Sequence, residues 1–233
     1  LYTDINGANS GTINAVGYNV TDGHVWGSVT NGSGAVIGSD SLARIGEDGI
    51  PRHFVVSGLY NGGYNVGTID NDGVLYLYST NQTQIFRVDV NPTSPAYLTL
   101  LAPVLNTTAM DIADWAYNAI DGMIYGVGTT GTTHNLYRIN PTTGSRTVVG
   151  LVTGNAAFTN GAFGAAYMDA SGNLYVGDNT SGGVFKINTV HNTIGNTTAA
   201  LRSQGSPSGG NDGAMNHNAC IKPNAGRDTV VCI

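Results

Sequence analysis

Three aspartates near the middle of the chain, Asp111, Asp114 and Asp121, have the residue type that acid–base hydrolysis uses. A glycosidase holds two carboxyl groups a few ångströms apart across its sugar substrate. Nothing in the spacing brings these three together, Asp121 precedes a glycine as turn residues do, and glutamate occurs only at Glu47. We therefore expect no catalytic residue, and a hydrolase or lyase is the least favoured of three functional hypotheses.

One motif, Asp70-Asn-Asp-Gly73, resembles the start of a calcium loop. However, Asp-Gly also occurs at residues 22–23 and 121–122 of sister segments, and no carboxylate follows Asp72 until Asp89. Asp-Gly suits a tight hairpin turn, because glycine adopts positive φ at low cost. Five histidines show no metal-ligand spacing: His24, His53, His134, His191 and His217. Phosphate-loop and dinucleotide motifs are also missing from the sequence, which predicts neither a metal nor a cofactor.

An internal repeat of about fifty residues is the clearest pattern in the chain. Four segments align as hairpins, at residues 14–27, 65–77, 114–126 and 164–176, and their turn glycines are Gly23, Gly73, Gly122 and Gly172. The spacings are 73−23 = 50, 122−73 = 49 and 172−122 = 50. A third strand-like run follows each hairpin, at residues 42–45, 85–89, 136–140 and 184–188, and a fourth apolar run such as 146–150 comes next. This pattern predicts four-stranded propeller blades.

An aromatic residue recurs shortly after each turn glycine, at Trp26, Tyr76, Tyr125 and Tyr175. A single blade cannot bury such a ring on both faces, whereas two blades packed face to face can. We interpret these four residues as a structural aromatic column.

The chain begins on Leu1-Tyr-Thr-Asp-Ile-Asn6, which resembles the third strand of a blade. The missing strands of that blade could come from the stretch beyond Leu201, including Thr229–Ile233. We expect an all-β propeller of five blades, four continuous and one shared between the termini, which would remove exposed strand edges. The propeller domain is predicted at residues 1–220, with an extended tail or the start of another module at 221–233.

Composition narrows the partners and the compartment. Only 10% of residues are charged and the net charge is −6, so a basic surface for nucleic acid is not expected. No run approaches 18 apolar residues, so we expect no membrane insertion. Cys220 and Cys232 could form one local disulfide in an oxidising compartment. Six Asn-x-Ser/Thr sequons, barely above the number expected by chance, leave N-glycosylation open: Asn19, Asn31, Asn81, Asn106, Asn179 and Asn196.

The repeats, with Gly209-Gly-Asn-Asp-Gly-Ala214 and Cys220, resemble an uncharacterised family of bacterial secreted propeller domains. Members commonly end in Asn-Asp-Gly-Ala with a Cys two residues on, whereas here the Cys comes six residues on. The resemblance covers roughly residues 1–220 and implies a secreted fold, with little indication of chemistry.

The final residues 223–232 resemble the opening strand of immunoglobulin-like modules in Bacteroidota surface proteins, with Arg227 replacing the usual Pro. That likeness implies a secreted protein longer than this chain. In such bacteria O-glycans join Asp-Ser/Thr-hydrophobic triplets, which makes Ser41 and Thr229 candidate sites.

The favoured hypothesis is a non-enzymatic, extracellular structural or adhesive module, which could polymerise into a fibre by strand pairing at its termini. Its partners would be further copies or other surface proteins. The alternative is a lectin-like propeller that binds glycans, with residues 129–134 and 155–158 as candidate loops.

Overall fold

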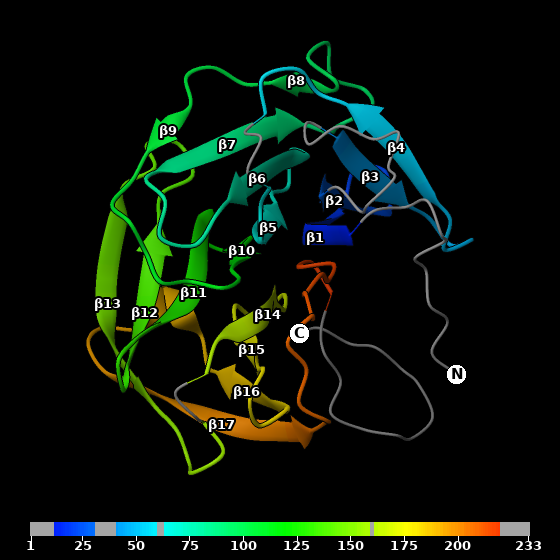
Figure 1. Cartoon of the computed structure of the whole chain (residues 1–233). Helices are drawn as coiled ribbons and strands as arrows, with labels where there is room; N and C mark the ends of the chain where they lie inside the picture. Colours follow the sequence, from blue (N-terminus) through cyan, green and yellow to red (C-terminus); the bar gives the residue numbers. More distant parts are fainter. Residues whose placement is uncertain (1–11, 31–40, 60–62, 159–160, 220–233) are drawn as a thin grey trace.

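The computed structural model describes residues 12–30, 41–59, 63–158 and 161–219. Within these ranges the regular structure is β-strand apart from one 3-10 turn, Val190–Asn192. The strands form successive sheets arranged around a centre (Figure 1). No helix of the described part has the length and apolar character that crossing a membrane requires.

Four successive units each contain four strands in up-and-down order. The first is β1 (Thr12–Asn19), β2 (His24–Thr30), β3 (Ser41–Ile45) and β4 (Pro51–Val55). The second is β5 (Val66–Ile69), β6 (Val74–Tyr78), β7 (Gln84–Asp89) and β8 (Thr99–Leu100), with β9 (Leu105–Asn106) also pairing with β7. The third is β10 (Ala116–Asn118), β11 (Met123–Thr130), β12 (Thr133–Ile139) and β13 (Arg146–Thr153). The fourth is β14 (Phe163–Met168), β15 (Leu174–Asp178), β16 (Gly183–Ile187) and β17 (Thr197–Gln204).

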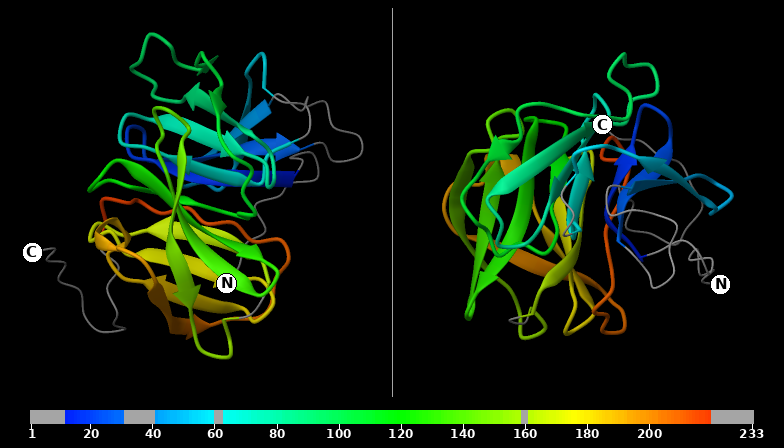
Figure 2. Two further views of the ribbon diagram at one scale, coloured as in Figure 1. Left: turned by 90° about the vertical axis from the view of Figure 1, so that its left-hand side faces the viewer. Right: turned by 45° about the horizontal axis from the view of Figure 1, so that its top comes forward.

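The third and fourth units join at their outer strands into one eight-stranded, barrel-like sheet. The junction is short, because β13 and β17 pair in parallel only at Val152–Thr197 and Thr153–Thr198. Figure 2 shows this sheet on the opposite side of the molecule from the first unit.

The predicted hairpins are confirmed. Each turn glycine links the first two strands of its unit, at φ +74° for Gly23, +81° for Gly73, +70° for Gly122 and +71° for Gly172. A side chain at these positions would force the backbone into a region that L-residues rarely occupy. The regular spacing of the turn glycines therefore sets the repeat of the fold.

Three apolar clusters fill the interfaces between consecutive units. Trp26 and Leu42 of the first unit pack with Leu75 and Leu77 of the second. The second and third units share a cluster that includes Tyr78 and Trp115, whose rings stack with centroids 5.3 Å apart. The third and fourth units share the largest group of buried residues, which includes Tyr125 and Phe185.

The described residues contain four four-stranded units, and five blades are not confirmed. Residues 1–11 and 220–233, which were assigned to the fifth blade, lie outside the described part. β17 continues through Gln204 as the outer strand of the fourth unit, so residues 202–204 do not belong to a fifth blade. Residues 205–219, hereafter the C-terminal segment, contain no strand. Pro207 and four glycines in this segment disfavour a strand ladder.

Candidate functional site

The aspartate of each hairpin turn has a structural role that repeats through the molecule. One carboxylate oxygen accepts backbone N–H groups of the turn, and the other accepts a hydrogen bond from the aromatic residue of the column. The four aromatic bonds are Trp26 to Asp22 at 3.0 Å, Tyr76 to Asp70 at 2.9 Å, Tyr125 to Asp121 at 2.6 Å and Tyr175 to Asp169 at 3.1 Å. The four rings are at most 6% exposed.

A basic residue on the third strand lies opposite each aromatic residue. The paired residues are Trp26 with Arg44, Tyr76 with Arg87, Tyr125 with Arg138 and Tyr175 with Lys186. Arg44 lies 5.7 Å from the Trp26 ring and Lys186 lies 6.0 Å from the Tyr175 ring, within cation–π range. Each unit therefore repeats an Asp–aromatic–base triad, which accounts for Asp70 and Asp121 as turn residues.

The three central aspartates have three different surroundings. Asp121 belongs to a turn triad, Asp114 is 1% exposed, and Asp111 is exposed at the rim of a pocket. Asp114 accepts the N–H groups of Trp115 and Ala166, and its carboxyl group interacts electrostatically with that of Asp212 in the C-terminal segment. Sequence reasoning missed Asp212, because its partner lies in another repeat and the spacing between them carries no signal.

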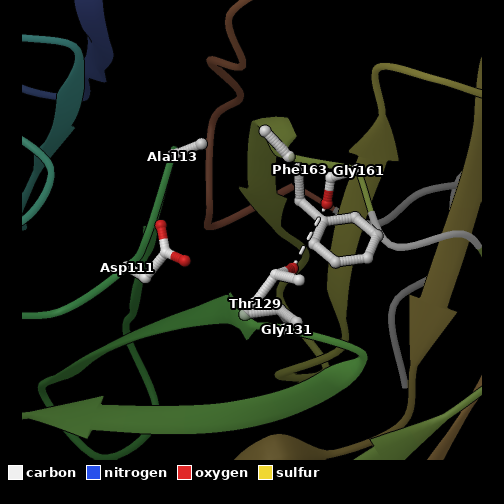
Figure 3. Close-up of a pocket in the computed structure, with 8 residues that line it drawn as sticks. Asp111, Ala113, Thr129, Gly131, Gly161 and Phe163 are labelled. Atoms are coloured by element: carbon white, nitrogen blue, oxygen red, sulfur yellow. Dashed lines mark hydrogen bonds between the residues drawn. The ribbon is translucent and has the colours of Figure 1, made fainter.

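A pocket of about 220 Å³ lies between the third and fourth units. Its lining comprises Asp111, Ala113, Val127, Thr129, Gly131, Gly161, Ala162 and Phe163. In Figure 3 the Asp111 carboxylate stands on one side and the Phe163 ring on the other, with Thr129 between them. The Thr129 hydroxyl donates to the carbonyl of Gly161 at 3.2 Å, which ties the end of β11 to the segment before β14. The pocket therefore opens where two neighbouring units meet.

Behind this lining lies an aromatic cluster. The rings of Phe158 and Phe163 stack with centroids 4.7 Å apart, and His134 meets both edge-on at 4.8 and 5.4 Å. His134 Nδ1 lies 3.1 Å from the Thr129 hydroxyl, and burial lowers the pKa of this imidazole. The two loops selected from the sequence, 129–134 and 155–158, thus contact each other through His134 and Phe158, and the first of them lines the pocket.

The pocket offers a carboxylate, a hydroxyl and an apolar wall. Hydroxyl groups of a ligand could donate to Asp111, while its carbon skeleton could contact Phe163 and Val127. Pockets for drug-sized ligands measure roughly 300–1,000 Å³, so this smaller one suits a ligand about the size of a single sugar ring. The lining contains one carboxyl group, whereas glycoside hydrolysis uses two.

The structure separates the candidate glycosylation sites. Asn81, Asn106 and Asn196 are exposed and Asn179 is partly exposed. Asn19 is 0% exposed and its amide donates to the carbonyl of Val90, while Ser41 is 1% exposed. The prediction of Asn19 and Ser41 as glycosylation sites is therefore corrected, because a buried side chain cannot carry a glycan in the folded protein. Asn31, Thr229, Cys220 and Cys232 lie outside the described residues.

Comparison with solved structures identifies the fold as β-propeller-like. Hydrazine synthase of Kuenenia stuttgartiensis is 9% identical with a TM-score of 0.50, covering 87% of this chain and 53% of that one. Virginiamycin B lyase from Staphylococcus aureus is 12% identical with a TM-score of 0.50, covering 87% and 60%. A chain of a nidogen/laminin complex is 16% identical with a TM-score of 0.51, covering 85% and 72%. This chain thus spans little more than half the length of the first two.

No curated protein matches the sequence. A family described as a repeat of unknown function, DUF6923, matches residues 1–218, which include all the strands described above. The chain belongs to this repeat family.

Proposed function

We propose that this chain is a non-enzymatic, extracellular adhesive module that binds neutral carbohydrate in the pocket between its third and fourth units. The observation that carries the proposal is one sugar-sized pocket lined by Asp111, Thr129 and Phe163, with the Phe158 ring stacked on Phe163 at 4.7 Å. A carboxylate that accepts ligand hydroxyls, placed opposite an apolar wall, is a common way to orient a polar ligand.

A neutral glycan fits this pocket better than an anionic one. Asp111 places a carboxylate at the rim, and the lining contains no basic side chain that could offset an anionic ligand. An anionic sugar would therefore meet like charge at short range. A neutral sugar meets an acceptor, a hydroxyl and a small apolar wall.

The test is a glycan array followed by titration calorimetry of the best neutral ligand. We expect Asp111→Ala and Thr129→Ala to weaken binding at least about tenfold, which corresponds to roughly 1.4 kcal/mol. Asp72→Ala is the matched control, because Asp72 is an exposed turn aspartate outside the pocket. An array without a specific binder would contradict glycan binding, and release of a cleaved sugar would contradict a non-enzymatic role.

Polymerisation into a fibre is a second proposed function, and the outer edge of the first unit favours it. In the described part of the chain β4 pairs with β3 on one side only. Val55 on β4 is 69% exposed and the adjoining Ile50 is 59% exposed. An apolar strand edge of this kind can add a strand from another copy.

Light scattering and electron microscopy of the purified full chain test fibre formation. We expect regular filaments that shorten or disappear in Val55→Lys and in a chain that lacks Pro223–Ile233, while Ile194→Lys has no effect. Ile194 is the matched control because it is 96% exposed on another unit. A uniform monomer at all concentrations would contradict polymerisation.

A further inference from the structure

The junction between the fourth and first units differs from the other three. Each of the three apolar clusters joins consecutive units, and none contains described residues of both the first and the fourth. The C-terminal segment lies in this gap instead, close to β1 and β14 at the centre of the ring (Figure 1). Among the described residues, this junction is therefore closed by polar contacts of one segment rather than by a shared apolar cluster.

The contacts of the C-terminal segment reach all four units, since the His217 ring also meets Tyr117 of the third unit edge-on at 5.2 Å. Asp212 accepts the N–H of Val16 in β1 at 3.0 Å. The N–H of Ser208 donates to the carbonyl of Asn179, in the fourth unit, at 3.0 Å. His217 Nε2 lies 2.8 Å from the side-chain oxygen of Asn71 in the second unit. Ala219 accepts the N–H of Ala170 at 2.9 Å. Release of the segment would remove these contacts between the first and fourth units.

A buried pair of carboxyl groups is at the centre of this closure. Asp114 accepts N–H groups from its own unit and from Ala166 of β14, and Asp212 accepts those of Val16 and Gly213. The two carboxyl groups also lie close enough to interact, and their mutual repulsion falls when one of them holds a proton. The closed ring therefore holds a proton that two free carboxylates would release at neutral pH.

Burial raises the pKa of both carboxyl groups. Burial is the largest cause for Asp114, followed by the charge of Asp212, and the pKa of Asp114 lies well above its usual value. Burial raises the pKa of Asp212 to about 7, against the lowering effect of the N–H groups of Val16 and Gly213. Two neighbouring like charges in a desolvated site oppose full ionisation.

The other groups that face this site do not determine how it responds to pH near neutrality. β1, β5 and β14 direct backbone N–H groups at it, from Ala15, Val16, Gly67 and Ala166. Gly213 shares a small pocket with His217 and with the tyrosines Tyr18, Tyr117 and Tyr167. Burial lowers the pKa of His217 to about 4, so this imidazole is neutral in the closed ring, and burial raises the pKa of Tyr117 and Tyr167.

The C-terminal segment packs tightly against β14 at Gly213, but two glycines before it have open space around them. A Cβ atom at Gly213 would lie 2.5 Å from the carbonyl oxygen and 2.6 Å from the nitrogen of Ala166, so only glycine fits there. By contrast, residues 205–210, Gly-Ser-Pro-Ser-Gly-Gly, are all exposed, and Gly209 and Gly210 have open space around them. Backbone hydrogen bonds hold Gly205 to Gly182 and Ser208 to Asn179, so Gly209 and Gly210 form the flexible connection to the docked residues 211–219.

We propose that the C-terminal segment is a releasable closure of the ring, held by the Asp114–Asp212 carboxyl pair and freed as the pH rises above neutrality.

The proton balance gives the direction of the effect. At pH 7 the docked segment retains carboxyl protons that the released segment has lost, while His217 is mostly neutral in both states. Below pH 6.5 the released His217 gains a proton and offsets one of the two carboxyl groups. The released state thus binds fewer protons near neutrality, and each net proton that opening releases makes the open-to-closed ratio rise about tenfold per pH unit, or about 100-fold from pH 6 to pH 8.

Hydrogen–deuterium exchange of the full chain, corrected for the intrinsic pH dependence of exchange, measures the opening directly. We expect exchange of residues 211–219 to rise up to about 100-fold between pH 6 and pH 8, while β11 and β15 stay protected. Asp212→Asn should flatten this dependence, because the amide can donate to an ionised Asp114. Asp72→Asn, at an exposed turn, should behave as the unaltered chain.

A second pair of variants tests the docking without changing charge. Gly213→Ala should raise exchange of residues 211–219 at least tenfold at pH 6, and Gly209→Ala should leave it unchanged. The proposal is overturned if the segment exchanges at one rate from pH 6 to pH 8, or if Asp212→Asn keeps the original slope. It is also overturned if Gly213→Ala has no effect, or if the strands become exposed together with the segment.

Discussion

At the residue scale, the repeated chemistry of this chain is structural. Each turn aspartate closes its hairpin and accepts a hydrogen bond from a buried ring one strand further on. The turn residues and the aromatic column could be predicted from spacing, because both recur at about fifty residues. Their bond to each other could not, because the separation varies between Asp22–Trp26 and Asp70–Tyr76. Spacing alone therefore could not show that these carboxylates have a structural role rather than a catalytic one.

Removing one column hydroxyl tests this role. Tyr125→Phe deletes the 2.6 Å bond to Asp121, and we expect a loss of about 1.5–3 kcal/mol, the usual range for a bond to a charged group. Tyr167→Phe is the matched control, because the Tyr167 ring stacks on Tyr175 and none of the described hydrogen bonds uses its hydroxyl. Urea denaturation measures both variants. Equal stability of the two would show that the hydroxyl bond contributes nothing.

At the element scale, the hairpins follow from the sequence but the closure does not. Turn glycines and alternating apolar residues are local signals, and they predicted the first three strands of all four units. The C-terminal segment carries no such signal, since it docks through Asp212 and Gly213 rather than through a strand ladder. Likewise, the site pocket forms where loops of two units meet, which no single repeat contains.

The innermost strands β1 and β5 pack so closely that their contact requires glycine. A Cβ atom at Gly67 would overlap the backbone of Ala15, and one at Gly17 would lie 2.8 Å from the nitrogen of Ile69. We expect Gly67→Ala to destabilise the protein by at least about 1–3 kcal/mol, as overpacking does, because backbone cannot move aside as a side chain can. Thermal unfolding measures the effect. Gly210→Ala, in open space, should unfold as the unaltered protein does.

At the scale of the whole molecule, stability depends on shared cores between neighbouring units. Each unit contributes one face to an apolar cluster, so no unit has a complete core of its own. The same arrangement explains why the polar junction between the fourth and first units is the place where the ring can open. A local opening there leaves three shared cores intact, whereas disruption of a core affects two units at once.

Trp115 provides the sharpest test of this coupling. It is 0% exposed and stacks on Tyr78 of the neighbouring unit, so Trp115→Ala should cost about 3–5 kcal/mol. The chain has two tryptophans, so in this variant fluorescence reports only Trp26, in the first unit. If the units unfold together, Trp26 fluorescence and the circular dichroism of all the sheets should change at one reduced urea concentration. Circular dichroism that falls before Trp26 responds would mean that the units unfold separately and that the shared cores do not couple them.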